Sequence, residues 1–446
     1  MPHKNSPSVL TQERLIAELK SLSYARSKVS FLLGTDEMIH LEARVAMTPD
    51  HIERLQADLA EVGLEAEIYV VSGAGDRAKP SFTDEDYEAS GAEVISVEEA
   101  ADLDDLDVVH ALKEPTSYES TLPGRMLRIG ALHLASKPPG ICDLLKAKNF
   151  SAILDGGTVG NCSYLLVEGD RTPIVGSMSR FAGMVAGRKV VEGLERNGVG
   201  AGKMIIVGGG IAGQAAIREV GPKTEKLVVI EPWEPMRRRL KAMLPGMGFH
   251  DYEIQAELTD ELMEGAVGIV FAHRSGAKAA EKVCNYEQIR KLAKGAAISD
   301  IAIDQGGAIA HDGYVETDDA TTAREKYIAL LGDDYAYYAE VNMPREEPHH
   351  ASLTHGEASL PYVTTLLALC AHLGGPEQAA ARLLEKPVKI YGQGEDVEGM
   401  SIFEAILQDL RNGLQLAYLD GEIRITDEDI ENDANLSGWL RSCMAG

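Results

Sequence analysis

Four side chains that could do chemistry stand at the ends of predicted buried strands. Arg44 lies in LEARVAMTP between a strand end and a helix start, Lys113 follows a strand in HALKEP, and His133 lies in the apolar run IGALHLAS. Asp304 lies in SDIAIDQGG directly after residues 301–303, which read as a short buried strand. Each alone fits an ordinary structural role, such as an ion pair. Together they form a set of two cations, a histidine and a carboxylate, at the strand ends where α/β proteins bind ligands.

A glycine-rich loop predicts a dinucleotide site. In KMIIVGGGIAGQAAIREV, residues 204–207 form a strand, and Gly208, Gly210 and Gly213 then have GxGxxG spacing and open a helix. This spacing allows a tight turn, a close approach of backbone to pyrophosphate, and close packing of helix on strand. A second strand ends on Glu231, where an acid receives the adenosine ribose hydroxyls. An acid there opposes a 2′-phosphate, so the expected cofactor is NAD.

The elements around these residues alternate between strands and helices. VSFLLGT, AEIYVVSG and DLDVVHAL read as strands, PDHIERLQADLAEVG reads as a helix that stops at Gly63, and MSRFAGMVAGRKVVEGL reads as a long helix. This order predicts an α/β fold with mainly parallel sheets, and 446 residues are enough for two domains. Residues 344–355 read as a linker, and YLDGEIRI near the end reads as a hairpin.

Composition narrows the classes of partner. A net charge of −27 argues against binding to nucleic acid or to an anionic membrane surface. No signal peptide and no membrane-length apolar run is visible, so a cytoplasmic protein is expected. Neither a disulfide framework nor a thiolate metal site is expected, because no CxxC pair occurs among the scattered cysteines Cys142, Cys162, Cys284, Cys370 and Cys443.

A family resemblance extends from about Thr35 to Val363. The chain resembles the alanine dehydrogenase and pyridine nucleotide transhydrogenase family in a series of segments that occur in the family's order: EARVAMTPDHIERL, SGAG, DEDYEASGAEVI, LKEP, LHLA, MSRFAGMVAGR, VGGGIAGQAA, SGAKA, DIAIDQGG, VNMP and ASLPYV. The resemblance implies two Rossmann-like domains. A discontinuous substrate domain would comprise residues 1–173 and 349–446, and an NAD-binding domain with a parallel sheet, residues 174–348, would be inserted between them.

The resemblance also implies roles for individual residues. Arg44 and Lys113 would hold a substrate carboxylate, and guanidinium and ammonium groups suit that task. His133 and Asp304 would move protons, as a histidine and a carboxylate can near neutral pH. Asp304 would also contact the nicotinamide ribose, whereas Asp300 would be structural. Three further residues complete the expected site: Met178 lining the pocket, and Ser179 and Asn342 contacting the cofactor.

The expected activity is NAD-dependent oxidative deamination of an L-amino acid to a 2-oxo acid and ammonia. Alanine or a larger amino acid is the expected substrate, because the family's dehydrogenases usually have an aromatic residue where this chain has Ala131. An assembly of identical subunits is expected from the family. One alternative is an opine-type enzyme, because LEAR and the lysine and histidine positions also resemble saccharopine dehydrogenases. The other is a non-catalytic NAD-binding module, as in a transhydrogenase.

Three further histidines lie close together in PHHASLTH. The spacing of His349, His350 and His355 fits no standard set of metal ligands, so no metal is expected there. The segment PHHASLTH is expected to form a hinge near the active site. Contact with the substrate is therefore the favoured role for these histidines.

Overall fold

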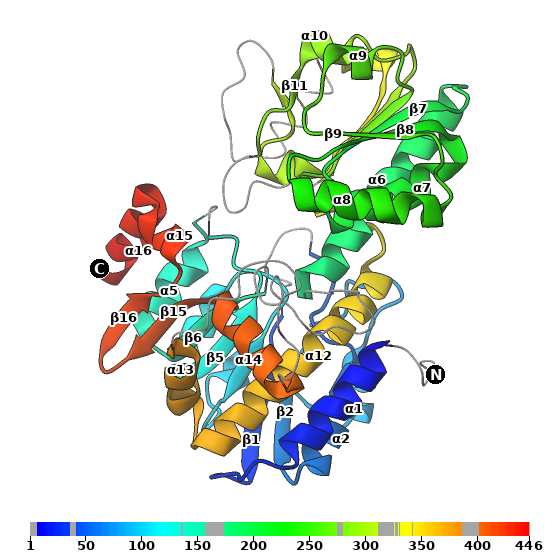
Figure 1. The fold of residues 1–446 in the computed structure, drawn as a ribbon. Helices are drawn as coiled ribbons and strands as arrows, with labels where there is room; N and C mark the ends of the chain where they lie inside the picture. The colour runs from blue at the N-terminus through cyan, green and yellow to red at the C-terminus, as the bar shows by residue number, and fades with distance from the viewer. Residues whose placement is uncertain are drawn as a thin grey trace. The chain divides into compact units, whose positions relative to one another are not determined.

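The computed structural model describes residues 7–35, 42–134, 137–156, 174–273, 280–310, 325, 329, 331–340, 342–385 and 401–445. Internal contacts divide the chain into two compact units (Figure 1). The first comprises Met1–Ser177 and Glu347–Gly446, and the second comprises Met178–Glu346. Each unit is built around its own sheet, which confirms the predicted α/β fold class.

The first unit contains an eight-stranded sheet in the order β16-β15-β6-β5-β4-β1-β2-β3. Six strands are parallel: β1 (Lys28–Leu33), β2 (Glu65–Val71), β3 (Glu93–Ile95), β4 (Val108–His110), β5 (Met126–Gly130) and β6 (Phe150–Asp155). The antiparallel hairpin of β15 (Leu414–Leu419) and β16 (Glu422–Ile425) extends one edge. Asp420 and Gly421 turn this predicted hairpin with positive φ angles of 54° and 83°.

Helices cover both faces of this sheet. One face packs against α1 (Pro7–Leu19), α2 (Pro49–Glu61), α12 (Pro348–Leu373), α13 (Pro376–Leu384) and α14 (Ile402–Gly413). The other packs against α5 (Pro139–Ala147) and α16 (Ala434–Ala445). The short helices are α3 (Asp84–Ala89), α4 (Val97–Ala100), α15 (Glu428–Asn432) and the 3-10 turn η1 (Ser117–Thr121). The helix predicted to stop at Gly63 ends at Glu61, and Gly63 has a φ of 85°.

The expected linker at residues 344–355 is wrong, because α12 begins at Pro348. Proline is tolerated in the first turn of a helix, where its missing N–H has no partner to lose. Most of the helix is buried between the sheet and the other helices of that face, as its contacts with β1, β4 and α2 show (Figure 1). The segment that looked like a polar connection is therefore part of the core.

The second unit contains a six-stranded parallel sheet in the order β14-β12-β10-β7-β8-β9. Its strands are β7 (Gly202–Val207), β8 (Thr224–Ile230), β9 (Tyr252–Gln255), β10 (Gly268–Phe271), β12 (Ala297–Asp300) and β14 (Ala336–Tyr338). Separate apolar clusters lie on its two faces. The longer helices are α6 (Ile174–Arg196), α7 (Ile211–Val220) and α8 (Glu234–Met243), and a small sheet pairs β11 (Cys284–Asn285) with β13 (Ile309–Ala310).

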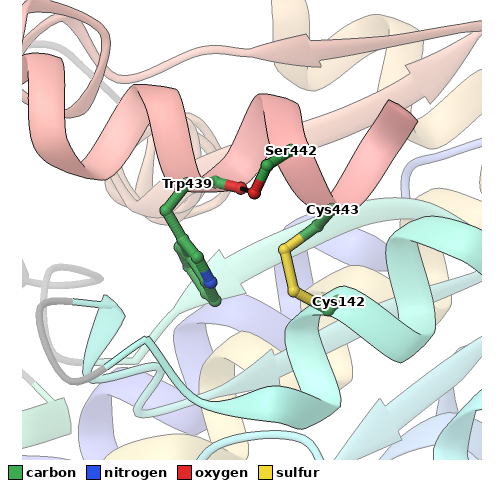
Figure 2. The surroundings of a disulfide bond; sticks show 4 residues. All are labelled: Cys142, Trp439, Ser442 and Cys443. Atoms are coloured by element: carbon green, nitrogen blue, oxygen red, sulfur yellow. Dashed lines mark hydrogen bonds between the residues drawn. A yellow bond between two sulfur atoms is a disulfide. The ribbon is translucent and has the colours of Figure 1, made fainter. Parts of the chain in front are cut away.

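A disulfide joins Cys142 on α5 to Cys443 on α16, with their Cα atoms 4.9 Å apart (Figure 2). The sequence predicts no disulfide framework, but one disulfide does form, at this pair. The two residues are 301 positions apart, so sequence spacing cannot reveal that they meet. The bond attaches the C-terminal helix to the face of the sheet that carries α5. Among the described residues, Cys284 and Cys370 are free thiols and buried.

No single described helix is long and apolar enough to cross a membrane. By length and composition alone, α12 and α13 together could form a membrane span, but the two helices are bent by 107° at the break between them.

Candidate functional site

Arg44 is held by a buried carboxylate that the sequence analysis did not single out. Its Nε and Nη2 atoms donate to Oε1 and Oε2 of Glu42, both at 2.8 Å. Glu42 is 2% exposed and Arg44 4%. Burial alone would raise the pKa of Glu42, but the charge and hydrogen bonds of Arg44, with the charge of Lys113, lower it to about 2. The structure therefore brings Arg44 and Lys113 to the same carboxylate.

His133 lies beside Lys113 through a second carboxylate, Glu114. Its Nδ1 is 2.9 Å from Oε2 of Glu114. Burial alone would raise the pKa of Glu114, but the hydrogen bond and charge of His133 and the charge of Lys113 hold it below its usual value. His133 has a φ of 42°, a left-handed backbone conformation that is uncommon for a residue with a side chain. Arg44, Lys113 and His133 therefore form one cluster, bridged by two carboxylates.

A buried arginine holds the loop that presents Lys113. Arg128 in β5 donates from Nη2 to the backbone oxygen of Lys113 and from Nε, at 3.1 Å, to Oε2 of Glu119 in η1. Arg128 and Glu119 are almost completely buried. The only sequence signal for this pair is an arginine within the apolar strand MLRIG. The sequence does not predict the pair of Arg128 and Glu119, because Glu119 lies outside the strand.

The loop that presents Arg44 is attached to α12. The backbone N–H of Val45 donates to Oγ of Ser352 at 3.0 Å. One turn further along this helix, His355 packs its ring against that of His110 at the end of β4, with 5.7 Å between ring centroids. His110 was also missed, although it lies within the predicted strand DLDVVHAL. Two imidazoles therefore lie in the core on the side of the sheet where Arg44 is anchored.

The other histidines of the PHHASLTH segment have different surroundings. His349 stacks on Phe82, and His350 is 3.7 Å from a carboxylate oxygen of Glu347. Over the described part of the chain, no group of histidine, cysteine, aspartate and glutamate side chains is arranged to hold a metal ion.

The second unit contains the glycine loop in the predicted context. Gly208 has a φ of 99°, and a Cβ there would be 2.7 Å from the backbone oxygen of Ala272. A Cβ on Gly213 would be 1.8 Å from the backbone oxygen of Gly208, so the helix packs directly on the turn. Gly210 precedes α7 and has open space where its Cβ would be. These features fit a loop that admits a pyrophosphate at a helix N-terminus.

Glu231 lies directly after β8 and contacts the glycine loop. Its Oε2 accepts the backbone N–H of Gly209 at 2.8 Å, and its Oε1 accepts that of Trp233 at 2.9 Å. The carboxylate is therefore fixed beside the loop, at the position from which an acid can receive ribose hydroxyls. Arg237 bonds to the backbone oxygens of Glu231 and Pro232.

Asp300 meets the backbone of the following residues. Its Oδ1 accepts the N–H of Ala302 at 3.0 Å and its Oδ2 that of Ala308 at 2.9 Å. The predicted strand at residues 301–303 is wrong: β12 ends at Asp300, and the 3-10 turn η5 (Ile301–Gln305) follows. The carboxylate caps this turn, which explains why an aspartate can be completely buried here. Asp300 is structural, as expected.

For the remaining expected site residues, the structure gives only the position of the backbone or the degree of burial. The backbone of Asp304 lies in η5, and its side chain is outside the described part. Met178 and Ser179 are partly buried on α6. Asn342 has a φ of 62°, and Ala131 at the end of β5 donates its N–H to the backbone oxygen of Leu112. The first unit thus gathers Arg44, Lys113 and His133, and their roles and those of the other residues stay predictions.

Comparison with known proteins gives matches to both units of the chain. Residues 35–182 match the model of the alanine dehydrogenase/PNT N-terminal domain, and residues 179–381 match that of the C-terminal domain. The chain is 26% identical over 406 residues to alanine dehydrogenase of Bacillus subtilis, covering 88% of this chain and 97% of that protein. It is 28% identical over 347 residues to alanine dehydrogenase 2 of Staphylococcus aureus, covering 74% and 85%.

Solved structures agree in fold. An L-alanine dehydrogenase superimposes with a TM-score of 0.62 at 20% identity, covering 92% of this chain and 99% of that one. A transhydrogenase from Sinorhizobium meliloti superimposes with a TM-score of 0.58 at 16% identity, covering 77% and 96%.

Proposed function

Because the chain belongs to the alanine dehydrogenase/PNT family, we propose that it catalyses the NAD-dependent oxidative deamination of an L-amino acid to a 2-oxo acid and ammonia. The family makes it an NAD-dependent oxidoreductase that acts on CH–NH2 groups and converts amino acids and 2-oxo acids. The proposal concerns the overall reaction and the roles of the residues. It rests on one observation, the cluster of Arg44, Lys113 and His133 bridged by Glu42 and Glu114.

The charges of this cluster suit an α-carboxylate. Arg44 and Lys113 contribute two positive charges near Glu42, which stays ionised because its pKa is about 2. A substrate carboxylate would bind to the guanidinium and the ammonium group directly, since both groups suit a carboxylate ligand. Glu42 also fixes the plane of the guanidinium, so Arg44 needs little reordering when a ligand binds.

His133 would move the protons of the reaction. Because Nδ1 is bonded to Glu114, Nε2 is the nitrogen that would exchange a proton with the substrate amine or with water. Asp304 is the second residue to which we assign proton transfer. The glycine loop and Glu231 fit the dinucleotide, which supplies the acceptor for the hydride from Cα. Oxidation leaves an iminium, water adds to its carbon, and ammonia departs as the carbonyl forms.

An opine-type reaction is the second candidate. Ala131, in place of an aromatic side chain, leaves room for a larger substrate or for a second amino acid as the amine. A non-catalytic module is disfavoured because it would have no use for the bonded pair of His133 and Glu114.

The test is the formation of NADH from NAD with a panel of L-amino acids, followed in reverse with 2-oxo acids and ammonia. His133→Ala should lower kcat by roughly 10²- to 10⁴-fold, the usual contribution of a general acid–base. Lys113→Met should mainly raise KM, whereas Lys146→Met, an exposed lysine on α5, should change neither. Turnover only with an amino acid as the amine would replace the proposal with the opine-type reaction. Undiminished turnover in His133→Ala would remove His133 from the mechanism.

A further inference from the structure

Two buried histidines lie where the substrate site meets the core. His110 ends β4 and is 1% exposed, and His355 on α12 is 6% exposed. Their rings are stacked at 5.7 Å with 27° between their planes. Neither has a role in the mechanism above. Both are unusual because a buried polar group is normally hydrogen-bonded.

Three of their four ring nitrogens have no hydrogen-bond partner among the described residues. Nδ1 of His110 is 3.1 Å from the backbone oxygen of Ile129, so it carries the proton, and Nε2 is left as an acceptor without a partner. Both ring nitrogens of His355 lack one. A buried polar atom left in this state costs about 1–3 kcal/mol. These nitrogens therefore call for a polar partner.

Both imidazoles are neutral at ordinary pH. Burial lowers the pKa of His110 to about 4. Burial also lowers the pKa of His355 well below its usual value, and the charge on Arg44 adds to the effect. The neutral pair offers one N–H donor, on His355, and two acceptor nitrogens.

The pair is linked to the expected substrate site on two sides. Ser352, one turn before His355 on α12, holds the backbone of Val45 beside Arg44. The pairing of β4 with β5 continues past the strand ends, because the N–H of Ala131 donates to the backbone oxygen of Leu112 at 3.1 Å. Ala131 therefore lies close to the strand end that carries His110.

We propose that His355 and His110 receive the side chain of the substrate, and that this side chain is uncharged and contains a hydroxyl or a carboxamide. This inference rests on the proposed function, because it names the class of amino acid that is oxidised. A hydroxyl or carboxamide both donates and accepts, which matches one donor and two acceptors. A cationic side chain is opposed by Arg44 and by burial. A carboxylate is opposed by Glu42 and by the two acceptor nitrogens.

The test compares substrates of nearly equal shape. L-Asparagine is compared with L-leucine, L-threonine with L-valine, and L-serine with L-alanine, each as kcat/KM with NAD. The polar member should be preferred by at least ~10-fold in one or more pairs, because a site with unmet hydrogen-bonding groups rejects the apolar analogue. His355→Leu should reduce that ratio by roughly 10-fold or more while largely preserving kcat/KM for the apolar member. His372→Leu, a partly exposed histidine near the other end of the same helix, should leave the ratio unchanged.

Binding provides a second readout that does not depend on turnover. Equilibrium dialysis of each amino acid in the presence of NADH should show tighter binding of the polar members to the wild-type protein. If polar members bind more tightly but no amino acid is oxidised, the role of His355 and His110 is supported and the proposed dehydrogenase function is refuted. If turnover occurs and the apolar members are equal or better in every pair, the proposed function stands and the role of His355 and His110 is refuted. The wild-type comparison decides this even where a variant fails to fold.

Discussion

At the scale of single residues, the main finding is that the expected carboxylate-binding arginine already has an anionic partner. Glu42 binds Arg44 through two nitrogens, and both side chains are buried. Burial without a partner would make either charge very unfavourable. The pair therefore keeps a guanidinium ready in the core, in a fixed plane, for a second carboxylate.

Glu42→Gln tests this preorganisation. The change removes the charge that balances Arg44, so the free energy of unfolding should fall by about 2–4 kcal/mol. A bound 2-oxo acid would restore the missing negative charge. The rise in thermal midpoint on adding a saturating 2-oxo acid with NADH should therefore be larger in Glu42→Gln than in the wild type.

The matched control is Glu93→Gln, at the exposed start of β3. It should change the free energy of unfolding by no more than about 0.5 kcal/mol and leave the ligand response unaltered. An equal ligand-induced shift in Glu42→Gln and in the wild type would mean that the ligand carboxylate does not bind at Arg44.

At the scale of elements, β5 and η1 together position the Lys113 loop. Arg128 in the strand pairs with Glu119 in the turn, and the same guanidinium holds the backbone oxygen of Lys113. Asn149 adds to this arrangement by donating to the backbone oxygens of Glu119 and Leu122. These contacts give the lysine a rigid support, which catalytic geometry requires.

Replacing Arg128 and Glu119 tests whether the pair only stabilises the fold or also positions the Lys113 loop. Arg128→Met alone should lower the free energy of unfolding by about 3–5 kcal/mol, because Glu119 is left buried and uncompensated. The double variant Arg128→Met, Glu119→Leu should recover most of that loss. It should still show a roughly 10-fold higher KM for the amino acid, because the Lys113 oxygen is no longer held.

Arg125→Met is the control, since Arg125 forms a partly exposed ion pair with Glu377 on α13. Its effect on the free energy of unfolding should stay below about 1 kcal/mol, and its KM should be normal. A double variant with wild-type KM would show that the pair serves only the fold.

At the scale of the whole molecule, the sequence predicted best what depends on local pattern. The glycine loop and Glu231 follow one strand–turn–helix rule, and the structure has them in that context. Predictions from the sequence were wrong where the interacting residues come from distant segments of the chain. The Cys142–Cys443 bond joins residues 301 positions apart, and α12 begins with polar residues that gave no sign of burial. The partners of Arg44 and Arg128 were missed because ion pairs depend on tertiary contacts rather than on local pattern.

The buried histidines should make the stability of the folded chain depend on pH. The pKa of His110 falls from 6.5 to about 4 on folding, and that of His355 also falls. Between pH 6.5 and 4 the unfolded chain therefore binds more protons than the folded one, and stability decreases as the pH decreases. His110 alone accounts for at most about 3 kcal/mol of this loss. Carboxylates such as Glu42, with a pKa of about 2, lose their contribution only at lower pH, below about 4.5.

The net charge of −27 should instead make the fold more stable as the pH decreases, because protonating surface carboxylates reduces their mutual repulsion. Salt screens that repulsion but affects buried groups much less. Denaturant unfolding at moderate ionic strength should therefore show stability falling from pH 7 to 5, with a smaller fall in His110→Phe and an unchanged one in His350→Leu. If His110→Phe and the wild type lose stability equally over this range, His110 binds protons equally in the folded and unfolded chains, so folding does not lower its pKa and its ring is better met by solvent or a ligand than the packing of β4 against α12 indicates.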